Sequence, residues 1–367
     1  MGKLKRAIGV MSGTSMDGID VALIETDGRS GLRHGPSFTF PYSEAFRERL
    51  GQAVADARGL KVRDERPGVL KLAEQYLTDL SAEAILQFLQ DIRIGSEQID
   101  VVGFHGHTVC HAPERRLTVQ IGDGARLARL VGIPVVYDMR AADVLAGGEG
   151  APLVPIYHQA LAFRLGKMPA VFVNIGGVAN VTYVGDHDEL IAFDTGPGNA
   201  LIDDWMAKHA ATAFDADGET ALNGVVDEPV LHDALRAHYF VEPPPKSLDR
   251  DAFDGALFEG LSLTAGAATL AAFTAEAIAR AREHFPREPA IWVVCGGGRK
   301  NKAIMTRLAE RVQNAVVPVE AIGLNGDSIE AEAWGYLAVR ALEGLALTFP
   351  GTTGVPGPTT GGIIAPP

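Results

Sequence analysis

The sequence predicts a layered α/β protein built from two domains that share one plan. Short apolar runs of strand length alternate with longer segments in which apolar residues recur every three or four positions. A strand, a glycine-bearing turn and a second strand open each half of the chain, at residues 6–24 and 170–184. The length of 367 residues also exceeds what one hydrophobic core usually serves, so two domains are expected.

The elements of the first half follow in order. Residues 6–11 form a short apolar strand, residues 12–18 a turn of small and polar residues, and residues 19–24 a second strand. Residues 70–92 repeat apolar side chains with helical spacing. Further on, the pattern predicts buried strands at 99–104, 117–121 and 134–137, with a short helix at 125–130.

The second half restarts with a strand at 170–175, the turn Gly176-Gly177 and a strand at 178–184. A third strand, 189–193, ends in Asp194, and Asn199 is suited to cap a helix over 200–210. The remaining predictions are a long helix at 257–284, a strand at 291–295 that runs into three glycines and a helix, and a last helix at 329–345. Segment 217–254 is interpreted as an excursion at the cleft, and the tail 350–367 as irregular.

Two such halves match the plan of actin-like (ribonuclease H-like) domains flanking a nucleotide-binding cleft, as in hexokinase-like ATPases. The predicted N-terminal domain covers residues 1–131 and is joined by the tail 350–367. The predicted C-terminal domain covers residues 132–349.

Composition and charge restrict the function. Hydrophobic residues make up 47% of the chain and charged residues 22%, as in ordinary globular proteins. The net charge of -13 argues against a nucleic-acid partner, because phosphate contacts require a basic face. No apolar stretch is suited to export or to a membrane span, and Cys110 and Cys295 are the only cysteines. The sequence therefore indicates a cytoplasmic protein.

The turn of the first half is a candidate phosphate site. Small residues let backbone N–H groups approach a phosphate, and hydroxyl groups add donors. Asp17 or Asp20 is suited to hold Mg²⁺, directly or through its waters. A plain hairpin turn is the alternative. The candidate nucleotide residues here are Gly13, Thr14, Ser15, Met16, Asp17, Gly18, Ile19 and Asp20.

Two turns of the second half repeat this pattern. Asn174, Gly176 and Gly177 form the first, for which tight β packing that needs glycine is the alternative. Gly296, Gly297 and Gly298 lie between a strand and a helix, where N–H groups at a helix start favour an anion. Their spacing fits neither a Walker A loop nor a dinucleotide-binding fingerprint, and in the actin-like plan this place holds the adenosine.

Asp194 is the candidate general base, because a strand-end carboxylate before a glycine-flanked turn faces the cleft. Its Asp-Thr-Gly triplet also occurs in aspartic proteases, but a second triplet is missing and the α/β context disagrees. A purely structural aspartate at a turn is the remaining alternative.

His105 and His107 end a strand, where alternation places both side chains on one face. No accompanying ligand motif supports a transition metal, so hydrogen bonding to a substrate is the favoured role. Asp327 and Glu330 have capping-box spacing at the last helix, which explains Glu330 without a functional role.

An ordered set of motifs spans nearly the whole chain. The motifs are residues 11–18, Phe104-His105-Gly106, residues 120–123, residues 140–143, residues 150–155, Asn174 to Gly177, Asp194 to Asn199, Gly296 to Gly298 and Asp327 to Glu332. Each motif alone is weak, but the set in this order resembles that of the anhydro-N-acetylmuramic acid kinases.

The resemblance implies two actin-like domains with a closing cleft, and a kinase of peptidoglycan recycling. Such an enzyme converts 1,6-anhydro-N-acetylmuramic acid, ATP and water into N-acetylmuramic acid 6-phosphate and ADP, with Mg²⁺. The resemblance assigns ATP phosphates to residues 13–20, the base to Asp194 and orientation of the water to Glu330. Arg140 is the implied partner of the lactyl carboxylate. The other implied sugar contacts are His105, His107 and Asp143.

Some residues depart from the family pattern. Lys246-Ser247-Leu248-Asp249-Arg250 stands where Lys-Ser-Thr-Gly-Arg is common, and His107 stands where Gln is usual. These departures bear on fine substrate contacts and not on the phosphate chemistry. Two rivals stay open beside the resemblance. One is another sugar kinase of the actin-like superfamily, and the other is a non-catalytic, nucleotide-gated binding protein. The sequence also leaves the oligomeric state open, a homodimer included.

Overall fold

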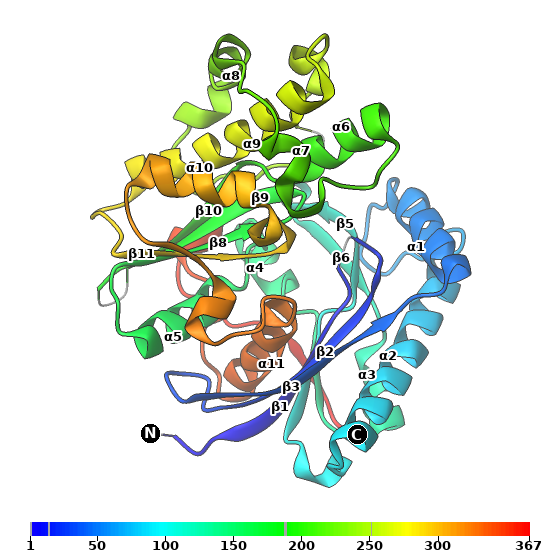
Figure 1. Ribbon diagram of the computed structural model, residues 1–367. Coiled ribbons are helices and arrows are strands. Elements are labelled where there is room, and N and C mark those ends of the chain that lie inside the picture. The colour runs from blue at the N-terminus through cyan, green and yellow to red at the C-terminus, as the bar shows by residue number, and fades with distance from the viewer. Residues whose placement is uncertain (1, 14, 187–188, 251) are drawn as a thin grey trace. The chain divides into compact units, whose positions relative to one another are not determined.

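The computed structural model describes residues 2–13, 15–186, 189–250 and 252–367. The chain folds into two compact units (Figure 1). The first unit comprises residues 1–164 and 328–367, and the second comprises residues 165–327. The sequence placed these boundaries at 132 and 350 instead. They lie elsewhere because a strand at 135–137 joins the first sheet and the last long helix packs on that sheet.

The first unit is built on a six-stranded sheet of order β13-β7-β4-β1-β2-β3. β1, β2 and β3 form an antiparallel meander, β4 and β7 continue parallel to β1, and β13 closes the far edge. β5 and β6 pair in a separate two-stranded sheet. The strands of the unit are β1 (Lys5–Met11), β2 (Gly18–Thr26), β3 (Leu32–Pro41), β4 (Val101–Phe104), β5 (His107–Ala112), β6 (Leu117–Ile121), β7 (Val135–Tyr137) and β13 (Ile363–Ala365). The helices are α1 (Glu44–Ala57), α2 (Leu70–Ile92), α3 (Gly124–Val131), α4 (Ala141–Ala146), α5 (Pro155–Leu165), α11 (Ile329–Leu342) and α12 (Pro350–Thr353).

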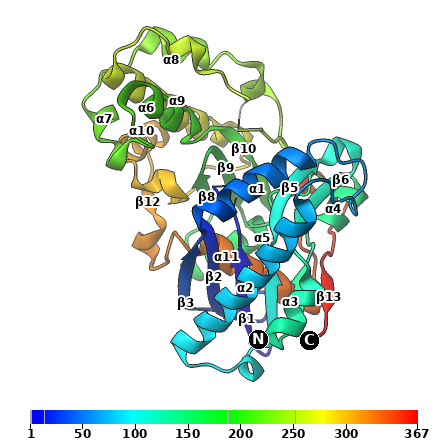
Figure 2. The same ribbon diagram turned by 90° about the vertical axis from the view of Figure 1, so that its right-hand side faces the viewer.

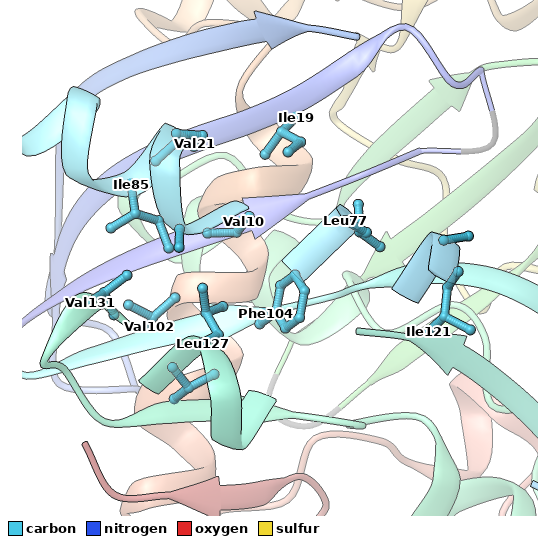
Figure 3. Close-up of a cluster of buried hydrophobic side chains, with 14 of the residues drawn as sticks. Val10, Ile19, Val21, Leu77, Ile85, Val102, Phe104, Ile121, Leu127 and Val131 are labelled. Atoms are coloured by element: carbon cyan, nitrogen blue, oxygen red, sulfur yellow. The ribbon is translucent and has the colours of Figure 1, made fainter. Parts of the chain in front are cut away.

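The pleat of β1 and β4 separates two layers of helices. Val10 and Val102 point into the core beneath α2 and α3, together with Phe104 and Leu127 (Figure 3). α11 covers the opposite face of the sheet (Figure 2). The residues of β1 and β4 that face α11 include glycines, so the helix backbone lies directly on the strands.

The second unit repeats the plan of the first. Its sheet has the order β10-β9-β8-β11-β12, in which β8, β9 and β10 form an antiparallel meander and β11 and β12 continue parallel to β8. The prediction that both halves share one plan is therefore confirmed. The strands are β8 (Ala170–Ile175), β9 (Val178–Val184), β10 (Leu190–Pro197), β11 (Ile291–Cys295) and β12 (Val316–Pro318). The helices are α6 (Ala200–Ala210), α7 (Glu219–Leu222), α8 (Glu228–Ala234), α9 (Leu263–Arg280) and α10 (Lys302–Val312).

The Ala-rich helix α9 is the centre of the second unit. Residues 266–279 are buried, because small side chains let α6, α7, α8 and α10 pack closely around the helix. Within the described ranges, no helix has the length and apolar character needed to cross a membrane.

Four local predictions about these elements were wrong. β10 continues past Asp194 to Pro197, with a register shift between Asp194 and Gly196. The side chain of Asn199 does not cap α6 but donates to the carbonyl oxygen of Ile175 at 3.1 Å.

α11 likewise has no capping box. Its N-cap residue is Ser328, while Asp327 forms ion pairs with Arg299 and Lys300 in the second unit. The tail is not wholly irregular either, since it contains α12 and β13, and β13 pairs with β7.

We expect Gly9→Ala to destabilise the first unit strongly. A Cβ at residue 9 would lie 1.7 Å from the carbonyl oxygen of Ala331 on α11, so the helix and strand backbones must separate. The free energy of unfolding should fall by about 2 kcal/mol or more, as for an overpacked core. Gly51→Ala on α1 is the matched control, because nothing lies within 4 Å of the added methyl. Chemical denaturation of both variants checks this prediction, and an unchanged Gly9→Ala protein would contradict it.

Candidate functional site

The turn between β1 and β2 presents polar groups to solvent. The N–H of Met16 donates to the carbonyl oxygen of Gly13 at 3.1 Å, and the Ser15 hydroxyl donates to Oδ1 of Asp17 at 2.7 Å. Ser15 and Asp17 are exposed. The predicted residue Thr14 lies outside the described residues. The turn therefore offers hydroxyl and carboxylate groups at its surface.

Three other predicted residues lie on β2, where the sheet explains much of their identity. A Cβ at Gly18 would lie 2.5 Å from the carbonyl oxygen of Phe40, so this glycine permits close pairing with β3. Ile19 belongs to the hydrophobic core. Asp20 accepts a hydrogen bond from the Thr39 hydroxyl at 2.5 Å. Contacts to a phosphate are thus best served by the turn itself.

Arg140 is a half-buried arginine that has no carboxylate partner among the described residues. Its guanidinium donates to Nε2 of His105 at 3.2 and 3.4 Å and to the carbonyl oxygen of Gly150 at 2.9 Å. It also lies 5.2 Å from the centroid of the Trp334 ring. Burial lowers the pKa of Arg140 to about 10, opposed by nearby negative charge, chiefly that of Glu330. No carboxylate oxygen of the described residues lies within 4.0 Å, so the cation is suited to an anionic ligand group.

His105 is held as a neutral acceptor for this arginine. Burial, and then the positive charge of Arg140, keep the pKa of His105 well below its usual range. Its ring packs against Trp334 with centroids 4.5 Å apart. The predicted shared strand for His105 and His107 was wrong, because Gly106, with φ of 71°, turns the chain between β4 and β5.

His107 is fixed by a short chain of hydrogen bonds. The Tyr42 hydroxyl donates to Oγ of Ser12 at 2.8 Å, and that oxygen lies 3.0 Å from Nδ1 of His107. Burial raises the pKa of Tyr42, so its hydroxyl remains a donor, and the Ser12 proton then points to Nδ1. Burial also lowers the pKa of His107 to about 4. Its neutral ring therefore carries the proton on Nε2, which has no hydrogen-bond partner among the described residues.

Two predicted residues have different surroundings. Asp143 is buried and accepts hydrogen bonds from the N–H of Gly150 at 2.6 Å and from the Thr353 hydroxyl at 2.7 Å, which favours a structural role. Glu330 is exposed at the start of α11, where its charge acts on Arg140.

In the second unit the two glycine turns adjoin each other. The carbonyl oxygen of Gly176 accepts from the N–H of Asn199 at 2.7 Å, at the start of α6. The side chain of Asn199 lies 3.7 Å from the position of a Cβ on Gly297. A Cβ at Gly296 would lie 2.3 Å from Oδ1 of Asn174 at the end of β8. The sequence-predicted residues of both turns are thus brought together.

The prediction of an α-helix start at Gly296 to Gly298 was wrong in detail. Gly297 opens a 3₁₀ turn, Gly297–Lys300, and α10 begins only after Asn301. The Asn301 side chain already accepts from the first N–H groups of α10.

Four glycines of the three turns have room for a side chain. They are Gly13, Gly176, Gly177 and Gly297, and none has a φ angle in the left-handed region. A Cβ added at these positions would meet its nearest described atom at 3.6, 3.5, 3.8 and 3.7 Å respectively. Tight packing therefore does not account for Gly176 and Gly177. Open space beside the backbone is what a phosphate-binding turn requires.

Asp194 lies half-buried on β10, the edge strand of the second sheet. Its Oδ2 accepts a hydrogen bond from the N–H of Leu248 at 2.8 Å, while Oδ1 accepts none from a described residue. Burial raises the pKa of Asp194 to about 7, the Leu248 N–H opposes this, and the charge of Asp249 adds to it. A carboxyl group that titrates near neutrality is suited to general-base catalysis.

Sequence reasoning missed several contributors to these groups. Trp334 was covered only by the predicted last helix, 329–345, without a role of its own. No pattern pointed to Tyr42 or to Tyr239, whose hydroxyl donates to the carbonyl oxygen of Asp194. Segment 246–250 did carry a sequence signal, namely its departure from the family pattern. In the structure, Leu248 of this segment contacts Asp194.

The donor set of the first turn fits Mg²⁺. Mg²⁺ is usually held by one or two carboxylates together with substrate phosphates and waters. Asp17 offers an exposed carboxylate there, and Asp20 lies on the adjoining strand. The described residues contain no group of three or more His, Cys, Asp or Glu side chains that could hold a metal ion.

Comparison with known proteins identifies close relatives over the whole chain. Residues 5–367 match the family described as anhydro-N-acetylmuramic acid kinase. An anhydro-N-acetylmuramic acid kinase of Bradyrhizobium diazoefficiens is 54% identical over 363 residues, covering 98% of this chain and 99% of the relative. One from Brucella suis is 52% identical over 373 aligned positions, covering 100% of both chains.

A solved structure shows the same fold at low sequence identity. Component A of the (R)-2-hydroxyglutaryl-CoA dehydratase of Acidaminococcus fermentans superposes with a TM-score of 0.50 and 10% identity. The superposition covers 92% of this chain and 98% of that one. The predicted fold class, an α/β protein with two actin-like domains, is confirmed.

We expect Asp194 to lower stability increasingly as the pH rises. Its folded-state pKa of about 7 exceeds the usual unfolded value near 4, so the folded protein binds the extra proton between these values. The unfolding free energy contributed by this group therefore falls from pH 4 to pH 8. Asp194→Asn should gain stability over the wild type across this window, by on the order of 2 kcal/mol. Denaturation of both proteins at several pH values checks this prediction, and a pH-independent difference would contradict it.

Proposed function

We propose that this chain, which belongs to the anhydro-N-acetylmuramic acid kinase family, uses ATP and water to open 1,6-anhydro-N-acetylmuramic acid and to phosphorylate its C6 oxygen. The observation that carries this function is Asp194, a half-buried carboxyl group with a pKa of about 7 and one oxygen left for a water molecule. A nucleotide-gated binding protein without chemistry has no use for such a group.

The reaction needs one general base. Asp194 accepts a proton from water while the water oxygen bonds to the anomeric carbon. The bond between that carbon and the bridging oxygen breaks, and the electron pair stays on the oxygen of C6. This oxygen then bonds to the γ-phosphorus of ATP, and the bond to the β-phosphate oxygen breaks to release ADP. A carboxyl group with a pKa near 7 is about half ionised at neutral pH, and its ionised form is basic enough to take the proton.

The glycine turns are the proposed nucleotide contacts. Backbone N–H groups around Gly13 and Gly177 would donate to phosphate oxygens, and Gly297 would lie against the adenosine. Gly176 would supply space for the phosphate, because its own N–H already donates to the carbonyl oxygen of Val178 at 3.2 Å. Asp17 and Asp20 would hold Mg²⁺, which neutralises charge on the transferring phosphoryl group. The net charge of -13 makes such local donors necessary for a polyanionic substrate.

Arg140 is the proposed partner of the lactyl carboxylate of the sugar. It is a partly desolvated cation with no carboxylate within 4.0 Å in the described ranges, and Trp334 and His105 fix its plane. We assign His105 and His107 to neutral hydrogen bonding near the sugar, and Glu330 to orientation of the water. Use of ATP and the presence of only two cysteines in the sequence support a place in the cytoplasm.

Asp194→Asn should reduce turnover at least about a hundredfold, because the amide accepts no proton from water. ATP affinity should stay within about twofold, since the phosphate contacts lie elsewhere. Release of ADP that depends on the anhydro sugar measures turnover, and calorimetry measures ATP binding. Undiminished turnover would remove Asp194 from the reaction. Faster phosphorylation of reducing N-acetylmuramic acid by the wild type would instead indicate an ordinary sugar kinase.

Gly177→Ala should weaken ATP binding about tenfold without loss of stability. The added methyl has room in the fold, with its nearest described neighbour at 3.8 Å, but it would occupy the surface that a phosphate approaches. Gly357→Ala in the tail is the matched control, because nothing lies within 4 Å of its added methyl. Equal KM values for ATP in both variants would contradict the proposed phosphate contact.

A further inference from the structure

The outer edge of β10 is covered by a segment distant in sequence. β10 has a neighbouring strand on one side only, and its register with β9 shifts between Asp194 and Gly196, so the sheet alone does not fix Asp194. Residues 239–248 run along the open side. The N–H of Asp194 donates to the carbonyl oxygen of Lys246 at 3.0 Å, and Leu248 donates to Oδ2 of Asp194.

Three hydrogen bonds close a ring that includes Asp194. The Asp194 N–H donates to the Lys246 carbonyl oxygen, the Lys246 ammonium donates to the Tyr239 carbonyl oxygen at 2.9 Å, and the Tyr239 hydroxyl donates to the Asp194 carbonyl oxygen. Each residue in the ring is thus both donor and acceptor. Removal of any one of these hydrogen bonds opens the ring.

The side chains of the ring also pack on one another. The Lys246 ammonium lies 4.5 Å from the centroid of the Tyr239 ring and 5.7 Å from that of Phe193, the residue before Asp194. Burial, and then the charge of Asp194, raise the pKa of Tyr239, so its hydroxyl stays a donor at every working pH. Lys246 therefore connects the two residues: its backbone carbonyl contacts Asp194, and its charged side chain contacts Tyr239.

We propose that Tyr239 and Lys246 are positioning residues that hold the Leu248 N–H against Oδ2 of Asp194 and keep Oδ1 directed to the water. The inference rests on the function proposed above. Lys246 lies two residues before Leu248, so a shift of Lys246 moves the N–H that stabilises the carboxylate. A loosened ring then makes Asp194 a weaker acid and a less well-aimed base.

Tyr239→Phe tests the ring by removing a single hydroxyl. We expect kcat to fall about tenfold, as for a misplaced catalytic group, with both KM values within about twofold. The pKa of Asp194 should rise because the Leu248 hydrogen bond weakens, so the inflection of kcat should move about half a unit to higher pH. A merely structural tyrosine would leave that inflection in place.

Lys246→Met supplies a second, independent variant that opens the ring at another bond and should shift the inflection in the same direction. Tyr76→Phe and Lys71→Met on the exposed face of α2 are the matched controls and should leave the profile unchanged. Titration of the Asp194 carboxyl by ¹³C NMR, with its signal assigned through Asp194→Asn, measures the same pKa without turnover.

The positioning role would be overturned if both ring variants kept the wild-type kcat and the wild-type inflection of its pH profile. A ¹³C titration that shows the wild-type pKa of Asp194 in these variants would overturn it as well. These outcomes differ from failure of the proposed function, in which the wild type itself forms no sugar phosphate. If a ring variant yields no folded protein, the other variant and its ¹³C titration decide the result.

Discussion

Withdrawal of one carboxyl group from water is the constraint on which the chemistry of this fold depends. Burial raises the pKa of Asp194 to about 7, and a single backbone N–H, from Leu248, opposes the shift. Because the ionised group is disfavoured, it destabilises the fold at neutral pH and remains reactive toward a proton. The surrounding segment, held through Tyr239 and Lys246, keeps the carboxyl in this unfavourable place.

The two units use one topology for different tasks. Each begins with an antiparallel meander whose first turn carries glycines with room for a side chain, and each continues with two parallel strands. In the first unit, Arg140 is a partly desolvated cation that contacts the rings of His105 and Trp334. In the second, a bulged edge strand carries Asp194. Backbone donors are thus repeated, while the charged side chains differ.

The sequence was sufficient for the fold because apolar periodicity and glycine turns are local signals. It predicted the strand 170–175, the helix 70–92 and the shared plan of the halves. It did not predict the unit boundaries, since the return of α11 to β1 is set by contacts between segments about 320 residues apart. The acidity of Asp194 was equally hidden, because burial and the bond from Leu248 arise from residues 54 positions away. Asp327 and Glu330 had capping-box spacing, yet tertiary ion pairs recruited Asp327 instead.

The most direct measurement follows the bridging oxygen of the substrate, because an anomeric hydroxyl exchanges with solvent and that oxygen does not. 1,6-Anhydro-N-acetylmuramic acid with ¹⁸O in the bridge is converted with ATP, and the product is analysed by ³¹P NMR. If Asp194 directs water to the anomeric carbon, the label lies between C6 and phosphorus and shifts the phosphorus signal. An unshifted phosphorus signal, with the label at C1 or lost to water, would contradict the mechanism.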